Sequence, residues 1–366
     1  MRILLISYND VQKDGRLNEL RRSLDFLGEV SVISNTSSNK MPGGGSLFAF
    51  QSSKKFSYID FLKYCKAIAK ENGPFDLIAA DNRNCIIPAL RCKNAGLGTC
   101  TLYDARELYI LKEVKSLKSK IGCIIEKMSV SKFDVVTCAN SFRAEAMVKL
   151  YGLNKTPIAF ENIRRLEYSD LSEQECESKF GSLFIDNIYT NVVTTSGEAL
   201  IRKADVLVEA IARLGEKYRL FLIGYEDEEG HKKIDEICRM TGWNNIIRYK
   251  WLSKSELKYI VSHCDIGIVN YSFQNTNNKY CASGKLYEFI FEGLPIVTTS
   301  NPPLSQLCSE HEIGISDDSF YEGIKTVVSD YKKYSDNVKR FGAQVRIEEN
   351  AEKVAEQIRT QLLSVK

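Results

Sequence analysis

Several features that mark other kinds of protein are missing from this sequence of 366 residues. It contains three histidines, and no two of its eleven cysteines are spaced C-x-x-C. A zinc site and a disulfide framework are therefore not expected, and the cysteines are predicted to be reduced core thiols. The N-terminal apolar run is too short for a signal peptide, and no later run approaches the roughly 18 residues of a membrane span. These absences predict a cytoplasmic protein without a structural metal.

Charge of one sign is also lacking. Fifty Lys and Arg residues against 47 Asp and Glu residues give a net charge of +3 at pH 7. This is almost neutral for the length, so the composition gives no sign of a nucleic-acid binder. Hydrophobic residues make up 44% of the chain. A chain of this length and composition is expected to form two domains, each with its own core.

Short apolar runs alternate with amphipathic segments along nearly the whole chain, a pattern typical of α/β proteins with parallel sheets. In the first half a strand is predicted over 2–7 and a helix over 17–27. In the second half a strand is predicted over 191–195 and a helix over 203–214. The Ser-, Asn- and Gly-rich stretch 35–56 is expected to be a mobile loop at the carboxyl edge of the first sheet.

The alternation breaks between residues 164 and 186, where charged and polar residues dominate, and an interdomain linker is expected there. The predicted organisation is an N-terminal Rossmann-like domain over 1–165, a linker over 166–186 and a C-terminal Rossmann-like domain over 187–345. A last helix over 346–366 is expected to pack back toward the N-terminal domain.

A long helical pattern over 111–128 carries an apolar stripe flanked by lysines. The stripe consists of Leu111, Val114, Leu117, Ile121, Ile124, Ile125 and Met128, and the lysines are Lys112, Lys115, Lys118, Lys120 and Lys127. A crossover helix packed on the sheet explains the stripe. A basic amphipathic helix also suits contact with anionic lipid headgroups, and both interpretations remain open.

The stretch from Ser283 to Val297 joins a polar loop, a short amphipathic helix and an apolar strand. A helix over 284–292 places its apolar residues on one face and Lys285, Glu288 and Glu292 on the opposite face. Ser283 is a favourable N-cap, and the N–H groups and dipole at a helix start attract anions such as a diphosphate. Glu288 is placed to accept hydrogen bonds from two ribose hydroxyls. The alternative is an ordinary capped surface helix.

A second candidate site is the tetrad Asp104-Ala105-Arg106-Glu107, which follows a strand predicted over 99–103. Open α/β sheets bind their ligands at the carboxyl ends of the strands. A charged loop without a function is the alternative.

Together these stretches resemble the GT-B fold glycosyltransferases, specifically the retaining family 4 type that build bacterial surface polysaccharides from sugar nucleotides. The resemblance covers nearly the whole chain. It is strongest over 283–288 and over Gly293-Leu294-Pro295-Ile296-Val297, which look like the donor-site segment of the family. Weaker matches in the family's order are the segments 14–19, 102–107 and 277–280. The resemblance implies an α/β fold with two Rossmann-like domains facing across a cleft.

The same resemblance implies roles for individual residues. The implied catalytic residues are Arg106, Arg202 and Lys285. The implied donor-binding residues are Glu288 on the ribose, Ser283 and Gly284 on the diphosphate, and Leu286, Tyr280, Ser196, Gly197 and Lys203 around them. Lys203 is the neighbour that would substitute for Arg202 in neutralising the diphosphate. The acceptor side is implied to comprise Gly15, Arg16, Asp104 and Glu107.

Three positions depart from the family pattern. Tyr280, eight positions before Glu288, stands where the first of two glutamates is usual. Arg106 takes the place of a His found in many relatives, and Gly15 stands alone where a Gly-Gly pair is common. A guanidinium stays charged at pH 7, so Arg106 is expected to bind phosphate or acceptor rather than to act as a base.

The expected function is transfer of a sugar from a nucleotide-diphosphate donor, UDP- or GDP-linked, to a saccharide or lipid-linked acceptor with retention at the anomeric carbon. No cofactor or metal is expected, since the chain has no Asp-x-Asp. One alternative is a sugar-nucleotide epimerase, with Asp104, Glu107 and His263 as loose acid–base candidates. The other is a non-catalytic GT-B scaffold. Peripheral contact with the cytoplasmic face of the membrane is expected only if the 111–128 segment binds lipid.

Overall fold

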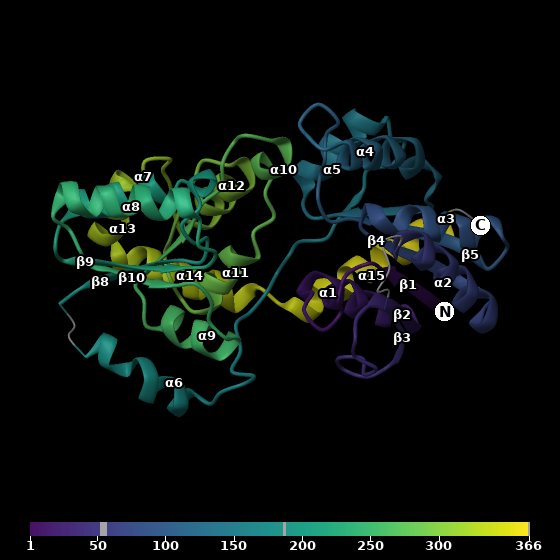
Figure 1. Ribbon diagram of the computed structural model, residues 1–366, viewed down its shortest axis with the longest axis horizontal. Coiled ribbons are helices and arrows are strands. Elements are labelled where there is room, and N and C mark those ends of the chain that lie inside the picture. Colours follow the sequence, from purple (N-terminus) through teal and green to yellow (C-terminus); the bar gives the residue numbers. More distant parts are fainter. Residues whose placement is uncertain (52–56, 186–187, 365–366) are drawn as a thin grey trace. The chain divides into compact units, whose positions relative to one another are not determined.

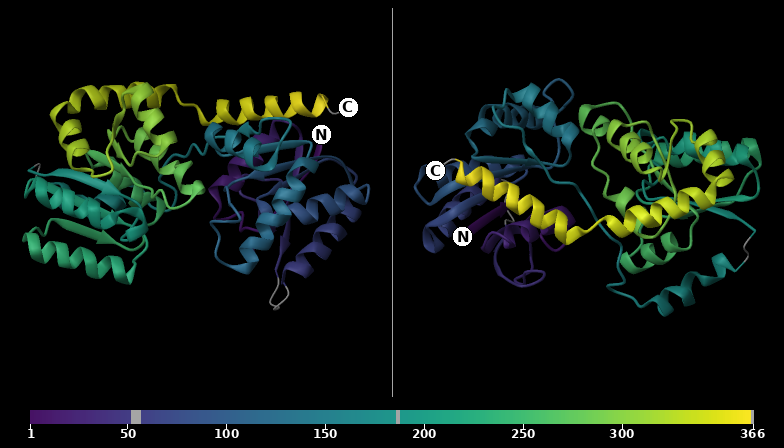
Figure 2. Two further views of the ribbon diagram at one scale, coloured as in Figure 1. Left: turned by 90° about the horizontal axis from the view of Figure 1, so that it is seen from above. Right: turned by 180° about the vertical axis from the view of Figure 1, so that it is seen from behind.

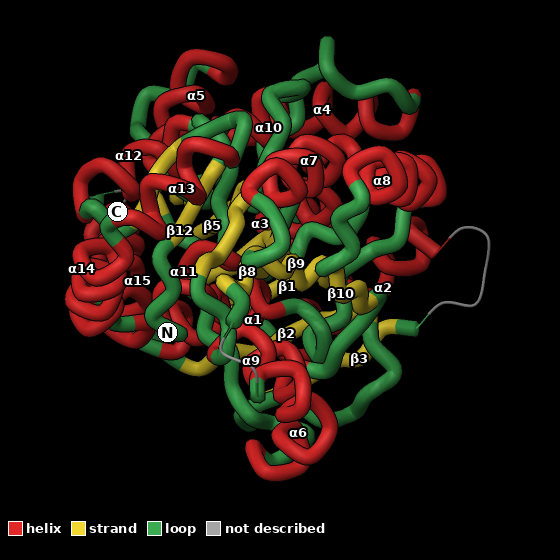
Figure 3. The backbone as a smooth tube through the Cα atoms, turned by 90° about the vertical axis from the view of Figure 1, so that its left-hand side faces the viewer, coloured by secondary structure: helices red, strands yellow, loops and turns green. Residues whose placement is uncertain are grey.

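The computed structural model describes residues 1–51, 57–185 and 188–364 of the chain. The chain forms two compact units (Figure 1). Met1–Asn162 and Ile347–Lys366 make up the first unit, and Ile163–Arg346 make up the second. Each unit is built around one parallel sheet, which confirms the α/β prediction of two Rossmann-like halves. In Figure 3 the strands, in yellow, lie among the helices, in red.

In the described part of the first unit, seven parallel strands follow the order β3-β2-β1-β4-β5-β6-β7. The strands are β1 (Arg2–Ser7), β2 (Glu29–Asn35), β3 (Ser46–Phe50), β4 (Phe75–Asp81), β5 (Gly98–Ala105), β6 (Val135–Cys138) and β7 (Ile158–Ala159). The order reverses between β1 and β4, where Ser7 lies in register with Asp81. Ligands of open α/β sheets bind at such a switch point, outside the carboxyl ends of the strands.

The helices of the first unit cover both faces of its sheet. They are α1 (Gly15–Asp25), α2 (Ser57–Asn72), α3 (Ile86–Asn94), α4 (Leu117–Ser129), α5 (Ser141–Tyr151) and α15 (Ile347–Leu363), with short 3-10 turns η1 (Arg83–Cys85) and η2 (Val130–Lys132). Leu20 of α1 and Ile358 of α15 share one apolar core. Phe61 of α2, Ile86 of α3 and Met147 of α5 belong to the core on the other face. Figure 2 shows α15, in yellow, running along this unit.

In the described part of the second unit, six parallel strands follow the order β10-β9-β8-β11-β12-β13. The strands are β8 (Thr190–Thr194), β9 (Tyr218–Ile223), β10 (Ile246–Tyr249), β11 (Ile266–Val269), β12 (Ile296–Thr298) and β13 (Gly314–Ser316). The order reverses between β8 and β11. The turns that follow these two strands therefore lie at the switch point of this sheet.

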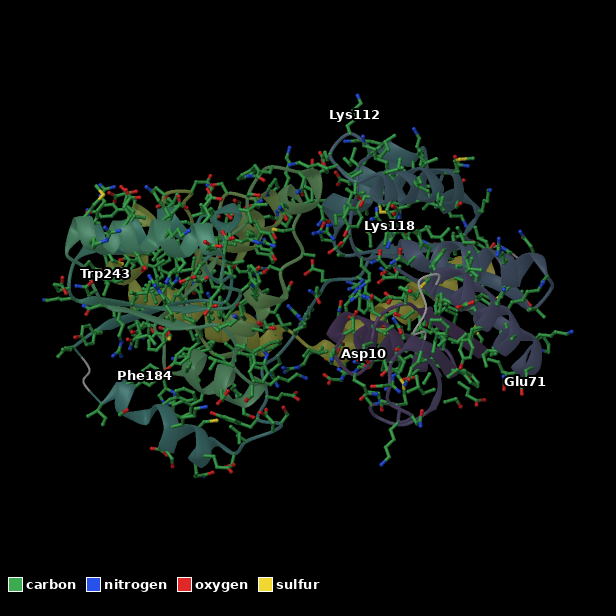
Figure 4. The ribbon with its side chains drawn as sticks, viewed as in Figure 1. Asp10, Glu71, Lys112, Lys118, Phe184 and Trp243 are labelled. Carbon is green, nitrogen blue, oxygen red and sulfur yellow. The ribbon has the colours of Figure 1, made fainter. Side chains whose placement is uncertain are left out.

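The second unit holds the remaining helices. They are α6 (Glu173–Phe180), α7 (Ala204–Leu214), α8 (Glu228–Thr241), α9 (Lys254–Ser262), α10 (Thr276–Lys279), α11 (Gly284–Phe291), α12 (Pro302–His311), α13 (Tyr321–Ser329) and α14 (Tyr331–Gln344), with η3 (Gly181–Phe184) and η4 (Leu200–Arg202). Leu207 of α7, Ile234 of α8 and Ile324 of α13 share one core with the buried Trp243. Figure 4 labels Trp243 beside α8.

Three segments differ from the predictions. The expected loop 35–56 contains β3, whose Leu47 lies in register with Val32 of β2, while residues 52–56 lie outside the described residues. The helix predicted from 111 begins at Leu117, because the Ser116 side chain accepts a hydrogen bond from Ser119 N and caps it there. The segment 166–186 contains α6, which starts with a capping box at Ser172 and Glu175.

Helix α4 packs on the first unit with only part of its apolar stripe, since Ile125 contacts the core. It buries Cys123 and Glu126, whereas Leu117, Ile121, Ile124 and Met128 are 73%, 49%, 45% and 67% exposed. The crossover-helix interpretation therefore does not account for these four residues.

Two further predictions concern the whole chain. All eleven cysteines are buried, which confirms that they are core residues, and none forms a disulfide within the described residues. Among the described residues, no helix is both long enough and apolar enough to cross a bilayer.

Candidate functional site

Helix α11 forms where the sequence predicts it, with Ser283 at the N-cap position. Leu286, Phe289 and Ile290 are buried on its apolar face, at most 1% exposed. The Ser283 side chain makes no hydrogen bond to the first turn. Ser283 therefore holds the predicted place but does not cap the helix with its hydroxyl. The start of α11 keeps the positive electrostatic character of a helix N-terminus.

Lys285 lies in the first turn of α11 and reaches the turn that follows β8. Its Nζ donates to Thr195 O at 2.6 Å and to Ser196 Oγ at 3.2 Å. Burial lowers the pKa of Lys285 to about 8, and the nearby Arg202 and Arg164 lower it as well, while Glu288 acts in the opposite direction. A buried ammonium beside two guanidinium groups is poised to gain an anion.

Arg164 belongs to this site, although the sequence analysis did not single it out. Its guanidinium fills the space beside the Gly284 Cα, because a Cβ on Gly284 would lie 2.0 Å from Arg164 Nε. The same Nε lies 3.6 Å from Glu288 Oε1. Arg164 falls in an irregular segment without periodicity, so no sequence signal linked it to α11. Gly284 is required here because any larger residue would displace the guanidinium.

Arg202 ends η4 and contributes a third cation. Its Cζ lies 4.1 Å from the centroid of the Tyr271 ring, a favourable cation–π contact. Its Nη1 is buried and makes no hydrogen bond within the described residues. The Arg202 carbonyl accepts a hydrogen bond from the side chain of Asn270. The Tyr271 ring therefore holds the guanidinium and the Asn270 side chain holds the Arg202 backbone, while no carboxylate forms an ion pair with Arg202 within the described residues.

The predicted turn at Ser196 and Gly197 packs closely on the end of β9. Gly197 has a φ of +65°, and a Cβ there would lie 2.3 Å from Tyr225 O, so only glycine fits. Lys203 points to a different partner, since its Nζ lies 2.8 Å from Asp318 Oδ1. Of the two basic neighbours, Arg202 is the one that the structure places in the electrostatic surroundings of Lys285.

Two other predicted donor residues have contacts of their own. Leu286 is buried among core residues and its N–H donates to Ser283 O at 3.3 Å. Tyr280 is the C-cap residue that follows α10, and Lys279 Nζ lies 5.4 Å from the centroid of its ring.

The predicted acceptor-side residues of the first unit form a buried ionic network. Arg16 Nη2 lies 2.9 Å from Asp104 Oδ1, and Thr137 Oγ1 donates to the same oxygen at 2.6 Å. Arg106 pairs with Asp14 and, at 3.3 Å, with Asp81. Two carboxylates therefore already neutralise the guanidinium that was expected to bind phosphate. An acceptor contact by Arg106 would have to compete with them.

Asp81, at the end of β4, was missed by the sequence analysis because nothing distinguishes it from other strand ends. Burial raises its pKa to about 6, although Arg106 and the hydrogen bond from Ser7 lower it. Ser7 Oγ donates to Asp81 Oδ2 at 2.6 Å.

The remaining predicted residues lie in ordinary structural contacts. Gly15 is the first residue of α1, which Asp14 caps by accepting from Leu17 N at 3.0 Å. The side chain of Glu107 accepts a hydrogen bond from the Tyr109 hydroxyl. His263, an epimerase candidate, lies 2.7 Å from Tyr259 O through Nδ1 and packs against the Tyr259 ring. No group of three or more His, Cys, Asp or Glu that could hold a metal ion occurs in the part of the chain that the structure describes.

The two sheets, their switch points and the cation cluster at α11 define the class: this is a GT-B fold. No protein-family model matches the sequence, and no curated protein sequence matches it. Among solved structures, it is similar to the sucrose-phosphate synthase tll1590 of Thermosynechococcus elongatus, with a TM-score of 0.71, 15% identity and 100% of both chains covered. Anabaena HepE (Alr3699) in complex with UDP and glucose has the same values.

A third similar structure is named as an epimerase and not as a synthase or a transferase. It is the UDP-GlcNAc 2-epimerase of Neisseria meningitidis bound to UDP-GlcNAc, with a TM-score of 0.63, 10% identity and 100% of both chains covered. At these identities the likeness establishes the fold alone.

Proposed function

We propose that this protein is a glycosyltransferase that moves a sugar from a nucleotide-diphosphate donor to a saccharide or lipid-linked acceptor, with retention and without a metal. The observation that carries the proposal is the cluster of Arg164, Arg202 and Lys285 at the start of α11, which faces one carboxylate, Glu288. Three cations and a helix N-terminus suit a diphosphate.

The reaction asks the protein chiefly to stabilise negative charge on the departing diphosphate. Arg202 and Lys285 would hold that charge with the start of α11, and a fixed arrangement of positive groups is effective because it needs no reorganisation during the reaction. Glu288 would accept hydrogen bonds from the ribose hydroxyls. Arg164, beside both Gly284 and Glu288, would orient that carboxylate. Family resemblance alone supports retention, and NMR of the product's anomeric configuration tests it.

UDP-linked sugars are the first donors to test, since the structures named for HepE and for the epimerase contain UDP or a UDP-sugar. Thermal shifts with UDP, GDP, ADP and CMP identify the base, and sugar release from the matching donor measures turnover. Glu288→Gln should weaken donor binding about tenfold, as expected for lost hydrogen bonds to a charged acceptor. Glu310→Gln, on the exposed face of α12, is the control. Equal binding by wild type and Glu288→Gln would refute the ribose role.

The epimerase hypothesis and the transferase proposal predict different products from the nucleotide sugar. Asp104 is fully buried and held by Arg16 and Thr137, so it lacks the access that an acid or base at a sugar requires. Incubation of donor without acceptor should give slow hydrolysis. Formation of an epimerised nucleotide sugar would favour the epimerase, and no response to any nucleotide would favour a scaffold.

We also propose peripheral membrane contact through the segment that contains α4. Lys112, Lys115, Lys118, Lys120 and Lys127 are exposed and make no ion pair within the described residues. They flank the exposed Leu117, Ile121, Ile124 and Met128, a combination that suits anionic headgroups and the acyl boundary. Figure 4 shows Lys112 extending away from the ribbon. Flotation with phosphatidylglycerol liposomes should recover the wild type, and recovery unchanged in Lys115→Gln/Lys118→Gln would refute this contact.

A further inference from the structure

A cavity of about 390 Å³ lies in the first unit, at the carboxyl edge of its sheet. Tyr8 follows β1, Arg83 and Asn84 follow β4, and the α4 residues Lys118 and Ile121 come after β5. The cavity therefore spans the switch point between β1 and β4, the position at which open α/β sheets bind ligands. Its volume is in the range of small-ligand sites.

Two other cavities in this unit lie at the opposite ends of strands. One, of about 270 Å³, is lined by residues that precede β6 and β7, such as Asp134 and Pro157. The other, of about 230 Å³, is lined by Met1, Asp76 and Thr99 at the starts of β1, β4 and β5. Neither has the location expected of an acceptor site, whereas the switch-point cavity does.

The lining of the switch-point cavity is mostly apolar and aromatic. Its apolar and aromatic members are Tyr8, Tyr58, Ile59, Ile87, Ile121 and Ile125. Its charged members are Arg83 and Lys118, and no carboxylate is among the described lining residues. A purely saccharide ligand would be expected to meet more hydrogen-bonding side chains. This lining instead suits a molecule with an apolar part and an anionic group.

The Arg83 side chain is held in the cavity lining by packing contacts. Its Cζ lies 4.0 Å from the centroid of the Tyr109 ring, and a Cβ on Gly122 would lie 3.3 Å from the same atom. Its Nη1 contacts Cys123 Sγ at 3.7 Å, and no ion pair with a carboxylate occurs within the described residues. The buried carboxyl of Glu126 is its electrostatic neighbour, and burial raises the pKa of that carboxyl to about 7. Arg83 is therefore at most partly neutralised, which favours the arrival of an anion.

The backbone just before Arg83 is strained. Asn82 has a φ of +65° and a ψ of +167°, a region that residues other than glycine rarely occupy. Its side chain accepts a hydrogen bond from Arg83 N at 2.8 Å, and its own N–H donates to Asp104 O at 3.0 Å. Such strain is typical of functional positions, and here it fixes the direction in which the chain leaves β4 toward Arg83.

Beside the cavity, α4 exposes further apolar side chains. Ile121 lines the cavity and is 49% exposed, and one turn away Leu117 is 73% exposed. An apolar chain that enters the cavity would therefore leave along an apolar surface and not through bulk water.

We propose that this cavity is the acceptor site, and that the acceptor is a phosphate-bearing lipid. Arg83 and Lys118 bind the phosphate, while Tyr58, Ile87, Ile121 and Ile125 hold the first part of the apolar chain. This inference rests on the proposed transferase function and narrows its acceptor from two classes to one. It does not depend on the donor site, which lies in the other unit.

The test is binding of farnesyl phosphate to the full chain, measured by titration calorimetry below the concentration at which the lipid forms micelles. Farnesol and inorganic phosphate are the two partial ligands. Wild type should bind farnesyl phosphate at least about tenfold more tightly than farnesol, since a charge-assisted phosphate contact is absent from the alcohol. Inorganic phosphate should not displace it at equal concentration. Equal affinity for the lipid and the alcohol, or displacement by phosphate alone, would overturn the proposal.

Two matched pairs of variants on α4 separate the cavity from general lipid adsorption. Ile121 lines the cavity and Ile124 does not, although their exposures are similar at 49% and 45%. Ile121→Ser should weaken farnesyl phosphate binding about fivefold while Ile124→Ser stays near wild type, because only the first removes apolar contact inside the cavity. Lys118→Gln should likewise weaken farnesyl phosphate binding, whereas Lys127→Gln should not, because only Lys118 lines the cavity. Equal losses within each pair would show adsorption to the helix surface and would refute the cavity.

The same proteins are then titrated with the nucleotide that stabilises the wild type. All four variants should bind it as the wild type does. If the wild type binds none of the four nucleotides but binds farnesyl phosphate, the transferase function is refuted and the lipid result stands. Nucleotide binding without farnesyl phosphate binding would refute the acceptor assignment.

Discussion

The guanidinium of Arg164 occupies the place where a side chain on Gly284 would have to lie, with Nε 2.0 Å from the position of that Cβ. One residue comes from the irregular chain that opens the second unit, and the other begins α11. Their contact brings a third cation to the start of this helix and places it 3.6 Å from Glu288. Because the guanidinium occupies this space, the site requires glycine at position 284.

Gly284→Ala should therefore leave the fold intact and weaken binding of the nucleotide diphosphate. The methyl group displaces Arg164, and the loss should be about tenfold, as expected for one charge-assisted contact. A double-mutant cycle with Arg164→Ala checks the cause. If the two changes act through one contact, the double variant should bind about as well as either single variant. Additive losses would show that Gly284 acts independently of Arg164.

The buried Lys285 should make donor binding depend on pH. Its pKa is lowered to about 8 in the free protein, so the ammonium deprotonates as the pH rises through that value. Affinity for the diphosphate should then fall between pH 7 and pH 9, measured by calorimetry in buffers of matched ionic strength. In Lys285→Met this part of the pH dependence should be absent. A wild-type affinity that is constant over this range would contradict the electrostatic role of Lys285.

The same lysine should reduce the stability of the free protein. Its folded pKa is depressed, so the unfolded chain binds more protons between pH 8 and the ordinary pKa of 10.5, and the free energy of unfolding should rise with pH in that window. Lys285→Met should raise the melting temperature at pH 7 while it weakens the response to nucleotide. A lower melting temperature in Lys285→Met would show instead that the hydrogen bonds to Thr195 and Ser196 dominate.

Glu126 of α4 should make the stability of the first unit depend on pH. It is fully buried and accepts a hydrogen bond from Tyr103 Oη at 2.6 Å, and burial raises its pKa to about 7. The folded protein therefore binds the extra proton between pH 4.5 and 7, and stability should fall as the pH rises through this range, by up to about 3 kcal/mol. Glu126→Gln should remove this dependence in thermal unfolding. An unchanged pH profile in that variant would contradict the assignment.

Much of the fold follows from local patterns in the sequence. Buried parallel strands such as β1 and β4 are continuous apolar runs, and α11 carries its apolar residues on one face, so both were predictable. The strand β3 was not, because five residues after a glycine run give too little periodicity. The start of α4 was misplaced because Leu111 and Val114 continue its apolar spacing, while the capping hydrogen bond at Ser116 is visible only in three dimensions.

The candidate site was predictable only in part, because some of its residues come together only through tertiary contacts. Lys285, Glu288 and Gly284 lie on one helix, where spacing fixes their relation. Arg164 reaches α11 from a segment 120 residues earlier in the chain, and Asp81 acquires its raised pKa from burial beside Ser7 and Arg106. Contacts of this kind depend on tertiary packing, which no local pattern encodes.

The most direct test of the central claim, a diphosphate site at the start of α11, is calorimetric titration of wild type and Lys285→Met with UDP, GDP, ADP and CMP. We predict that one nucleoside diphosphate binds the wild type, that CMP does not, and that a folded Lys285→Met binds the same nucleotide at least about tenfold more weakly. No binding by the wild type, or equal binding by wild type and variant, would contradict the account.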